Sequence, residues 1–308
     1  MTFLKVIEIW TPSSDGQSLT LFDGYFGKYE KFKQETIDHK FIFDLGLPGK
    51  AWSTAQPQII TDIAHSYFQR KKSAVQIGIT SGIAIPVFSG EFLMAVVIFL
   101  FGSDDNSEGA VELWANESRQ STKISLIDGY YGQLGNLEQT SRNLQFARGQ
   151  GLPGMTWDYQ LPMLITDPAK SPLFIRTQNA AIDNITTAVG IPFKNKNRDY
   201  VISFLSTNGT PIAKRFEIWL PSKDHDYLFL SSAKCTQDND LFNRLGYKKI
   251  RRGDGLKGRV WLTGCPAISE DLVTDELVQF NSKDEFKVGM VMPMIENGFL
   301  NSLIIFIF

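Results

Sequence analysis

Short apolar stretches separated by turn residues recur along the chain and predict a strand-rich protein. Residues 4–10 and 18–26 are rich in β-branched and aromatic side chains and flank turn residues 13–16, so they predict a β-hairpin. Residues 82–88 and 92–101 predict a second hairpin further along the chain. This pattern indicates antiparallel strands rather than long helices.

The segments between the two hairpins are more polar and predict short elements. Residues 29–36 form a polar connection with helical character, and residues 41–43 predict a short strand. We expect a helix to begin at Ser66 and to run to about residue 76, because serine is a favourable N-cap. Ser171 and Asp275 fall at matching positions later in the chain and predict the same cap.

A short string that occurs three times explains why this order of elements recurs. The string reads Gly-Leu-Pro-Gly, with lysine in place of proline in the third copy, and a tryptophan follows three residues later. The copies lie at residues 46–49, 151–154 and 255–258, with Trp52, Trp157 and Trp261 after them. Their spacing of 105 and 104 residues predicts three tandem domains rather than a solenoid of short repeats.

The period divides the chain into residues 1–104, 105–210 and 211–308. Only nine residues join the last strand of one repeat to the first strand of the next, which is too short for a useful helix. The predicted fold class is therefore α+β, with three domains that each form a mostly antiparallel sheet of five or six strands. Short helices are expected on one face of each sheet, and none at the ends of the chain.

The repeated string predicts a tight turn that opens a short helix. Gly46 can adopt a positive φ, and Pro48 suits the first turn of a helix, where its missing N–H costs nothing. Gly49 lets another backbone segment or a ligand approach closely, and Trp52 is expected on the inner face of the first turn. Pro57 is expected to end the helix.

Composition and charge exclude several classes of function. The 308 residues carry a formal net charge of −2, which marks no nucleic-acid or anionic-membrane surface. Two short basic clusters, at residues 70–72 and 248–252, are interpreted as solvated segments. Two cysteines are too few for a secreted disulfide scaffold, and the N-terminus shows no signal pattern. The longest apolar runs are too short to span a membrane. We expect a cytoplasmic protein with neither a nucleic-acid nor a membrane partner.

These residues resemble the GAF family, whose modules show a GLPGxxW string followed by a proline, an aspartate, a helix and a closing hairpin. Repeats 1 and 2 match best, because residues 23–25 and 128–130 also carry an Asp-Gly-Tyr string that repeat 3 lacks. The variant is similar to the divergent GAF-like domains at the N-termini of some plant transcription factors. The resemblance covers nearly the whole chain in three copies, the third diverged.

The resemblance implies a small-molecule pocket on one face of each sheet, roofed by the segments between the second and fourth strands. GAF modules usually sense cyclic nucleotides, tetrapyrroles, amino or keto acids or redox cofactors, or they mediate dimerisation. They usually carry relay helices before the first strand and after the last, which this sequence does not predict. A sheet without them exposes an apolar face, so we expect the repeats to cover one another's faces or the chain to dimerise through them.

Side chains of repeats 1 and 2 are the candidates for lining such pockets. The tryptophans could stack a planar ligand, the tyrosines could reach a pocket rim, and the aspartates could hold a ligand amine or hydroxyl. The alternative is that the tryptophans pack in the core and the aspartates serve as turn or cap groups. The candidate ligand-binding residues are Tyr25, Phe43, Trp52, Asp62, Tyr130, Phe146, Trp157 and Asp167. The sequence does not name a cofactor.

Glu8, Glu112 and Glu217 each share a strand face with a tryptophan two residues on. A polar group on a covered face needs a partner, so we expect each glutamate to contact an arginine or the backbone rather than to perform catalysis.

An enzymatic function would need thiol or metal chemistry that the sequence does not favour. Free methionine sulfoxide reductases resemble GAF modules and use cysteines around the motif loop. Repeats 1 and 2 contain no cysteine, and Cys235 and Cys265 match none of that family's cysteine-bearing strings. The three histidines show no zinc-ligand spacing.

The sequence therefore indicates a non-enzymatic sensory or regulatory protein that binds a small molecule in GAF-type pockets. The alternative is a degenerate GAF-fold platform for protein–protein interaction or dimerisation. A remote alternative is a thiol-dependent redox enzyme of the methionine sulfoxide reductase type. Expected partners are a small-molecule ligand and either a second copy of the chain or another protein.

Overall fold

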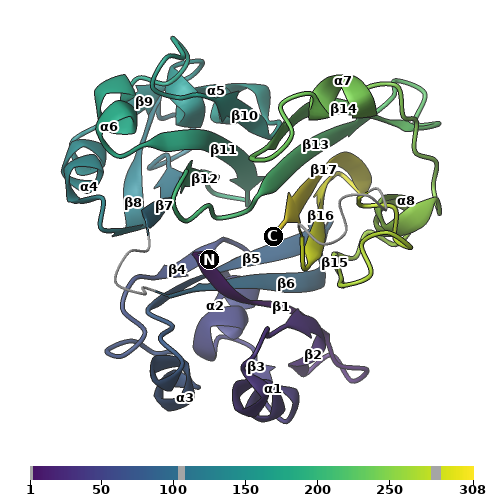
Figure 1. The fold of residues 1–308 in the computed structure, drawn as a ribbon. Coiled ribbons are helices and arrows are strands. Elements are labelled where there is room, and N and C mark those ends of the chain that lie inside the picture. Colours follow the sequence, from purple (N-terminus) through teal and green to yellow (C-terminus); the bar gives the residue numbers. More distant parts are fainter. Residues whose placement is uncertain (1–2, 103–107, 279–285) are drawn as a thin grey trace.

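Three antiparallel sheets meet at the centre of the molecule, and the helices lie outside them (Figure 1). The computed structural model describes residues 3–102, 108–278 and 286–308. Two sheets have six strands and one has five, with only short helices between strands, which confirms the predicted α+β class. We call each sheet with its helices a unit.

Unit 1 is a six-stranded sheet in the order β3-β2-β1-β6-β5-β4. Both predicted hairpins are present, β1 with β2 and β5 with β6, and the polar connection after β2 forms helix α1. The elements are β1 (Leu4–Pro12), β2 (Ser18–Tyr25), α1 (Glu30–Ile37), β3 (Lys40–Ile42), α2 (Gly46–Thr54), β4 (Gln58–Ile60), α3 (Lys71–Gln76), β5 (Ser81–Ser89) and β6 (Phe92–Phe101).

Unit 2 repeats this topology in the order β10-β11-β12-β7-β8-β9. Its elements are β7 (Glu108–Ala115), β8 (Lys123–Gly132), α4 (Gly135–Arg142), β9 (Gln145–Ala147), α5 (Gly151–Tyr159), β10 (Met163–Thr166), α6 (Thr177–Ile182), β11 (Ile185–Lys194) and β12 (Asp199–Thr207). The expected boundary at residue 104 lies outside the described residues. The boundary at residue 210 lies in the helix-free connection between β12 and the next unit.

Unit 3 has five strands in the order β14-β13-β17-β16-β15. Its elements are β13 (Arg215–Pro221), β14 (Leu228–Cys235), α7 (Leu241–Leu245), α8 (Gly255–Thr263), β15 (Ala267–Ser269), β16 (Gly289–Glu296) and β17 (Phe299–Ile307). A single bridge between Leu228 and Ile250 stands where units 1 and 2 have the edge strands β3 and β9.

The backs of the three sheets share one hydrophobic core, which confirms that the repeats cover one another's faces. Phe99, Phe204 and Phe306 project from the last strand of each unit and are at most 1% exposed. Their ring centroids lie 5.4 to 5.9 Å apart in all three pairings. No unit therefore leaves its apolar back open to water, although each lacks a helix over that face.

The edges of the sheets also meet in a cycle. Strand β4 of unit 1 packs beside β8 of unit 2, β10 of unit 2 packs beside β14 of unit 3, and β15 of unit 3 packs beside β2 of unit 1. Each contact joins different surfaces of two neighbouring units, and the series closes after three units. This is the arrangement that a threefold ring of separate chains would have, formed within one chain.

The predicted helix starts at Ser66 and Ser171 were wrong. Both hydroxyls accept a backbone N–H two residues on, from Phe68 at 3.2 Å and Leu173 at 3.3 Å, so each caps a turn rather than a helix. Helices α3 and α6 begin later, at Lys71 and Thr177. After Asp275 the described residues form turns and bends to residue 278, and the rest of the predicted helix, to residue 281, lies outside the described residues.

Candidate functional site

The repeated string forms the same tight turn in all three units. Its first glycine has φ values of 67°, 63° and 52° in Gly46, Gly151 and Gly255, as predicted for a left-handed position. A Cβ on the second glycine would lie 2.3, 2.1 and 2.3 Å from the backbone oxygens of Ile42, Ala147 and Arg251. The second glycine therefore serves a close approach of backbone to backbone, and the turn opens helices α2, α5 and α8.

In unit 1 the space between the sheet and its helices is filled by a buried ion pair. Glu8 of β1 is fully buried, and Arg70, the N-cap of α3, is 1% exposed, so the interpretation of residues 70–72 as a solvated segment was wrong for Arg70. The guanidinium donates two parallel hydrogen bonds to the carboxylate, at 2.6 and 2.8 Å, and a third to the Thr36 hydroxyl at 2.5 Å. The indole N–H of Trp10 donates to the same carboxylate at 2.8 Å. This bidentate geometry is the strong form of an arginine–carboxylate contact.

The guanidinium of Arg70 also packs among aromatic rings. Its Cζ lies 4.9 Å from the ring centroid of Phe32, 5.2 Å from that of Phe68 and 5.7 Å from that of Phe41. These contacts combine the burial of the ring faces with cation–π attraction. The interior of unit 1 is thus closed by side chains of the chain itself.

Unit 2 contains the same arginine–glutamate pair, but different side chains donate further hydrogen bonds to the carboxylate. Arg176, the N-cap of α6, holds Glu112 of β7 through both carboxylate oxygens, one of them at 3.0 Å. Ser141, Tyr131 and Trp114 donate to Glu112 at 2.9, 3.1 and 3.0 Å. Burial, followed by the charge of Glu112, raises the pKa of the Tyr131 hydroxyl, so that it remains a hydrogen-bond donor.

In unit 3 a lysine is among the basic partners of the buried glutamate. Glu217 of β13 is fully buried and pairs with Lys257 at 3.1 Å and with Arg215, and it accepts the indole N–H of Trp219 at 2.6 Å. Lys257 is the residue that replaces the motif proline in this copy. Burial alone would raise the pKa of Glu217, but Lys257 and Arg215 outweigh it and lower the pKa to about 2.

The expectation that each of these glutamates contacts an arginine or the backbone is met in all three units, through Arg70, Arg176 and Arg215. Arg70, Arg176 and Lys257 supply the opposite charge, and all three are at least 95% buried. The depressed pKa of Glu217 keeps its carboxylate ionised near neutral pH. The arrangement is suited to holding helices against the sheet.

The predicted ligand-binding tyrosines lie on the other face of the sheet from these ion pairs. Tyr25 and Tyr130 are half-buried against the central core, and the Tyr130 hydroxyl lies 3.1 Å from the Thr80 hydroxyl. Phe146 and Trp157 instead lie inside unit 2, where both are almost completely buried. The structure therefore separates the predicted residues of one repeat between two faces.

The remaining predicted residues lie at the surface. Asp62 pairs with His65 at 2.7 Å, and the hydrogen bond from this histidine lowers the pKa of Asp62. Asp167 pairs with Lys170 at 3.0 Å. Phe43 is 55% exposed and its ring meets that of half-buried Trp52 edge-on at 5.2 Å. The eight predicted residues are not gathered into one pocket.

Each motif tryptophan is covered by the residue three positions before the first glycine, a contact that sequence reasoning missed. Phe43 lies against Trp52 in unit 1, and Arg252 lies 4.9 Å from the ring centroid of Trp261 in unit 3. In unit 2, Arg148 lies 3.9 Å from the ring centroid of Trp157. The fixed spacing from the motif was the sequence signal that could have identified these contacts.

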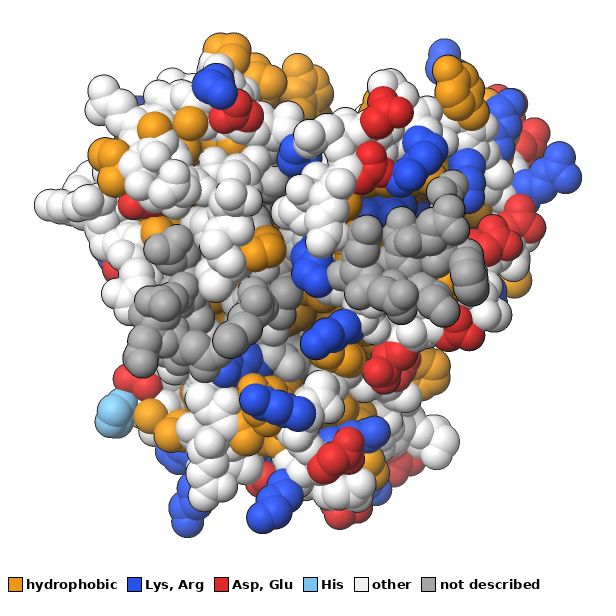
Figure 2. Space-filling model, viewed as in Figure 1, with side chains coloured by type: hydrophobic (Ala, Val, Ile, Leu, Met, Phe, Trp, Pro, Cys, Tyr) orange, Lys and Arg blue, Asp and Glu red, His pale blue; other side chains and the backbone are white. Residues whose placement is uncertain are grey.

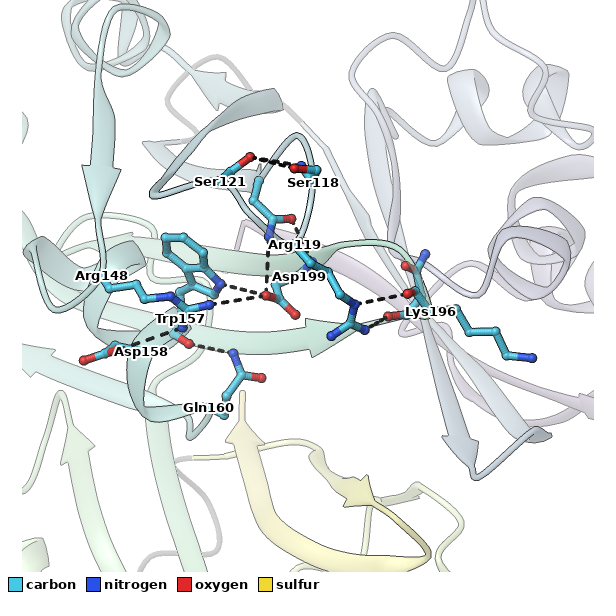
Figure 3. A network of polar contacts seen from close by, with 11 residues as sticks. Ser118, Arg119, Ser121, Arg148, Trp157, Asp158, Gln160, Lys196 and Asp199 are labelled. Carbon is cyan, nitrogen blue, oxygen red and sulfur yellow. Dashed lines mark hydrogen bonds and ion pairs between the residues drawn. The ribbon is translucent and has the colours of Figure 1, made fainter.

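Figure 3 shows how the Trp157 contact in unit 2 is extended. The indole N–H donates to Asp199 at 3.0 Å, and Arg148 lies 3.7 Å from the same carboxylate and 3.9 Å from Asp158. The network fixes α5 against the first residue of β12. Arg148 thus has two carboxylates close by, in addition to the indole face.

One of the cavities reaches the ion pair of unit 3, because its lining includes Lys257, the partner of Glu217. It has a volume of about 490 Å³, adjoins the start of α8 and is lined by residues 248–250, 254–257 and 275–276. A second of about 420 Å³ adjoins α6 in unit 2 and includes Asp167 in its lining. A small one of about 90 Å³ lies where Pro86, Pro192 and Pro293 of the three units meet.

Thiol and metal chemistry find little support in the described part of the chain. Cys235 is buried, and partial burial raises the pKa of the Cys265 thiol, which disfavours the reactive thiolate. The described residues contain no group of three or more His, Cys, Asp or Glu side chains placed to hold a metal ion. Among them there is also no helix long and apolar enough to span a membrane.

Comparison with known proteins gives matches only among solved structures. No protein-family profile and no curated protein matches the sequence. The GAF domain of A. Aeolicus nlh2 is 22% identical, with a TM-score of 0.27, over 33% of this chain and 60% of that one. The free methionine-R-sulfoxide reductase from Neisseria meningitidis is 17% identical, with a TM-score of 0.26, over 33% and 56%.

A third solved structure gives a match of the same extent. The GAF domain of a phosphoenolpyruvate-protein phosphotransferase from Coxiella burnetii is 11% identical, with a TM-score of 0.28, over 32% of this chain and 58% of that one. Each match covers about a third of this chain and less than two thirds of the other chain. The fold to which this chain is similar is GAF-like.

Proposed function

We propose that this protein is a non-enzymatic regulatory scaffold of three GAF-like units that acts through macromolecular contacts on its outer surface. The observation that carries this proposal is the filled interior of units 1 and 2. A buried glutamate with its basic partner stands where the resemblance placed a small-molecule pocket, as in Glu8 with Arg70 and Glu112 with Arg176. A ligand that entered there would have to separate a bidentate, desolvated ion pair.

The cost of such an opening supports the proposal. Breaking a buried ion pair by displacing one partner costs about 3 to 5 kcal/mol, because it leaves an uncompensated charge in a dry interior. A ligand with micromolar affinity gains only about 8 kcal/mol in total. A ligand inside these units would therefore need contacts worth about 11 to 13 kcal/mol to bind with micromolar affinity.

The shared core supports a scaffold for a second reason. The backs of the three sheets are fixed to one another through residues such as Phe99, Phe204 and Phe306, so the units cannot move as independent sensors. A surface with three related faces in fixed relative positions is suited to presenting binding sites to a partner. Partner recognition then depends on side chains outside the core and outside the ion pairs.

A thermal-shift screen tests this proposal. The protein is heated with nucleotides, amino acids, keto acids and bilins at about 1 mM, and ligand binding raises the melting temperature according to concentration and affinity. We expect no rise above about 1 °C. A compound that raises the melting temperature by several degrees, and whose effect changes in Glu8→Leu/Arg70→Met, would restore the small-molecule sensor.

A further inference from the structure

Unit 3 carries a strongly charged segment that the ion-pair network does not use. Residues 248–252, here called the basic loop, include the exposed cations Lys248, Lys249, Arg251 and Arg252. None of the four forms an ion pair with a described carboxylate, whereas the nearby Arg244 and Arg259 pair with Asp238 and Asp275. Lys249 lies over the ring of Tyr227 at 4.2 Å and Arg252 over that of Trp261 at 4.9 Å. Because none of the four charges has a carboxylate partner among the described residues, they attract an anionic partner.

The other two units supply an internal control for the fold. Residues 39–43 and 144–148 occupy the same place before the motif, and they carry one lysine or arginine each, Lys40 and Arg148. Arg148 has Asp158 and Asp199 as carboxylate neighbours, at 3.9 and 3.7 Å. The turn and its motif helix thus form without a cluster of cations, so packing does not explain the composition of the basic loop.

Fewer residues of the basic loop pair with the sheet than in the corresponding segments of units 1 and 2. In units 1 and 2 the corresponding segment forms an edge strand of three residues, β3 or β9. In unit 3 only Ile250 is paired, through hydrogen bonds of 2.8 and 3.1 Å with Leu228. The residues on both sides of Ile250 leave the sheet and are exposed, although the ammonium of Lys249 lies over the Tyr227 ring at 4.2 Å.

A cavity adjoins the basic loop. It has a volume of about 490 Å³, and its lining includes Lys248, Lys249 and the first turn of α8. Exposed aromatic side chains lie just before the loop in the sequence, with Tyr247 at 91% and Phe242 at 46% exposure. The lining also contains Asp254, Asp275 and Glu276, so the part of the recess suited to carboxylates is the side formed by Lys248 and Lys249.

We propose that the basic loop and its adjoining cavity dock an acidic peptide segment of a partner protein, an inference that rests on the proposed scaffold function. An acidic peptide fits better than a nucleic acid because the basic run is only five residues long and ends at carboxylates such as Asp254. Figure 2 shows Asp and Glu side chains among the Lys and Arg side chains over the region of α7 and α8. A phosphate backbone requires a longer and more continuous basic track.

Fluorescence anisotropy with defined probes tests the docking site. The probe is a fluorescein-labelled peptide of eight glutamates, and a peptide of eight glutamines is its neutral control. We expect saturable binding of the acidic peptide that weakens as sodium chloride rises from about 50 to 300 mM, because exposed charges are screened. The variant Lys248→Gln/Lys249→Gln/Arg251→Gln is expected to bind at least about tenfold more weakly; it keeps Arg252, which covers Trp261.

A matched variant removes three exposed cations elsewhere. Lys31→Gln/Lys40→Gln/Lys72→Gln makes the same change in net charge in unit 1, and Lys40 is the positional counterpart of Lys249. It is expected to bind within about twofold of the wild type, since its lysines lie outside the docking site. The melting temperature of each variant verifies folding, and Lys248→Glu serves as a second variant should the triple change unfold the chain.

Defined outcomes would overturn the docking site. These are no saturable binding of the acidic peptide, equal binding of the neutral peptide, or an equal loss in the unit 1 variant. A loop-dependent preference for a labelled twelve-nucleotide oligothymidine over the acidic peptide would replace the peptide by a single-stranded nucleic acid. None of these results bears on the filled interiors, so a failed docking site and a failed scaffold function are distinguished.

Discussion

Replacing Phe204 by alanine tests whether the three units form one structure. Its side chain is 1% exposed and meets the rings of Phe99 and Phe306, one from each of the other units, at 5.9 and 5.5 Å. Truncating a buried phenylalanine costs about 3 to 5 kcal/mol, which includes the cavity left behind. Because the free energy of unfolding of a native chain is only about 5 to 15 kcal/mol, this substitution should remove a large part of it.

The assay is urea unfolding followed by circular dichroism, with hydrogen exchange read by mass spectrometry in each unit. We expect Phe204→Ala to lower the free energy of unfolding by about 4 kcal/mol and to reduce protection in peptides of all three units, since its neighbours belong to the other two. The matched control is Phe299→Ala, whose side chain is 65% exposed. Its effect is expected to stay within about 0.5 kcal/mol.

Two results would refute the reasoning. A loss below about 1 kcal/mol for Phe204→Ala would mean that the ring is not in a packed core. Loss of protection confined to unit 2 would mean that the units fold independently, and that the contacts among Phe99, Phe204 and Phe306 contribute little.

Three further predictions concern the ion pairs and the motif. Arg70→Ala should lower the free energy of unfolding in urea by about 3 to 5 kcal/mol, because it leaves the Glu8 charge buried alone. The double change Glu8→Leu/Arg70→Met should recover much of this loss, because neither charge is then buried. A double variant no more stable than the single one would contradict the ion-pair account. Because the folded pKa of Glu217 is depressed to about 2, its stabilising effect is complete above its unfolded pKa and is lost as pH falls from about 4.5 toward 2. In acid titrations, Glu217→Gln should therefore reduce the pH dependence of the free energy of unfolding over that window. An unchanged pH dependence would count against this role of Glu217. Gly154→Ala should lower the free energy of unfolding by about 2 kcal/mol or more, because its Cβ would lie 2.1 Å from the Ala147 oxygen. The control Gly135→Ala, whose Cβ would meet nothing within 4 Å, should be neutral or slightly stabilising. Equal melting temperatures for the two variants would disprove the close approach.

Local signals in the sequence predicted the parts of the fold that depend on neighbouring residues. The turn residues at 13–16 and the alternation around them identified the first hairpin, and Gly46 and Gly49 indicated the motif turn. The burial of Glu8 also followed from its place on the strand face of Trp10, so its need for a basic partner was foreseeable. These inferences require only the period of a strand and the geometry of glycine.

The parts that depend on distant residues could not be read in the same way. Arg70 lies 62 positions from Glu8, in a segment that diverges between repeats, so nothing local identified it as the partner. In unit 3 the partner moved to Lys257, inside the motif itself. The turn bonds of Ser66 and Ser171 imitate a helix cap in sequence, which explains the misplaced starts of α3 and α6.

The candidate site illustrates the same limit. The glycine-following tyrosines Tyr25 and Tyr130 were expected at a pocket rim, and the pairing register instead turns them toward the central core. A strand face is assigned correctly only when the register is known, because a shift of one residue reverses every side chain. The sequence contained the composition of the basic loop, but the lack of carboxylate partners became visible only in the structure.

A crystal structure of the protein purified from cells without added ligand tests the central claim most directly. We expect electron density for the Arg70 guanidinium on the Glu8 carboxylate, with both hydrogen bonds near 2.6 and 2.8 Å, and no further density between the sheet and α1. Density for a bound molecule between Trp10 and a displaced Arg70 side chain would contradict the claim that the chain fills its own interior.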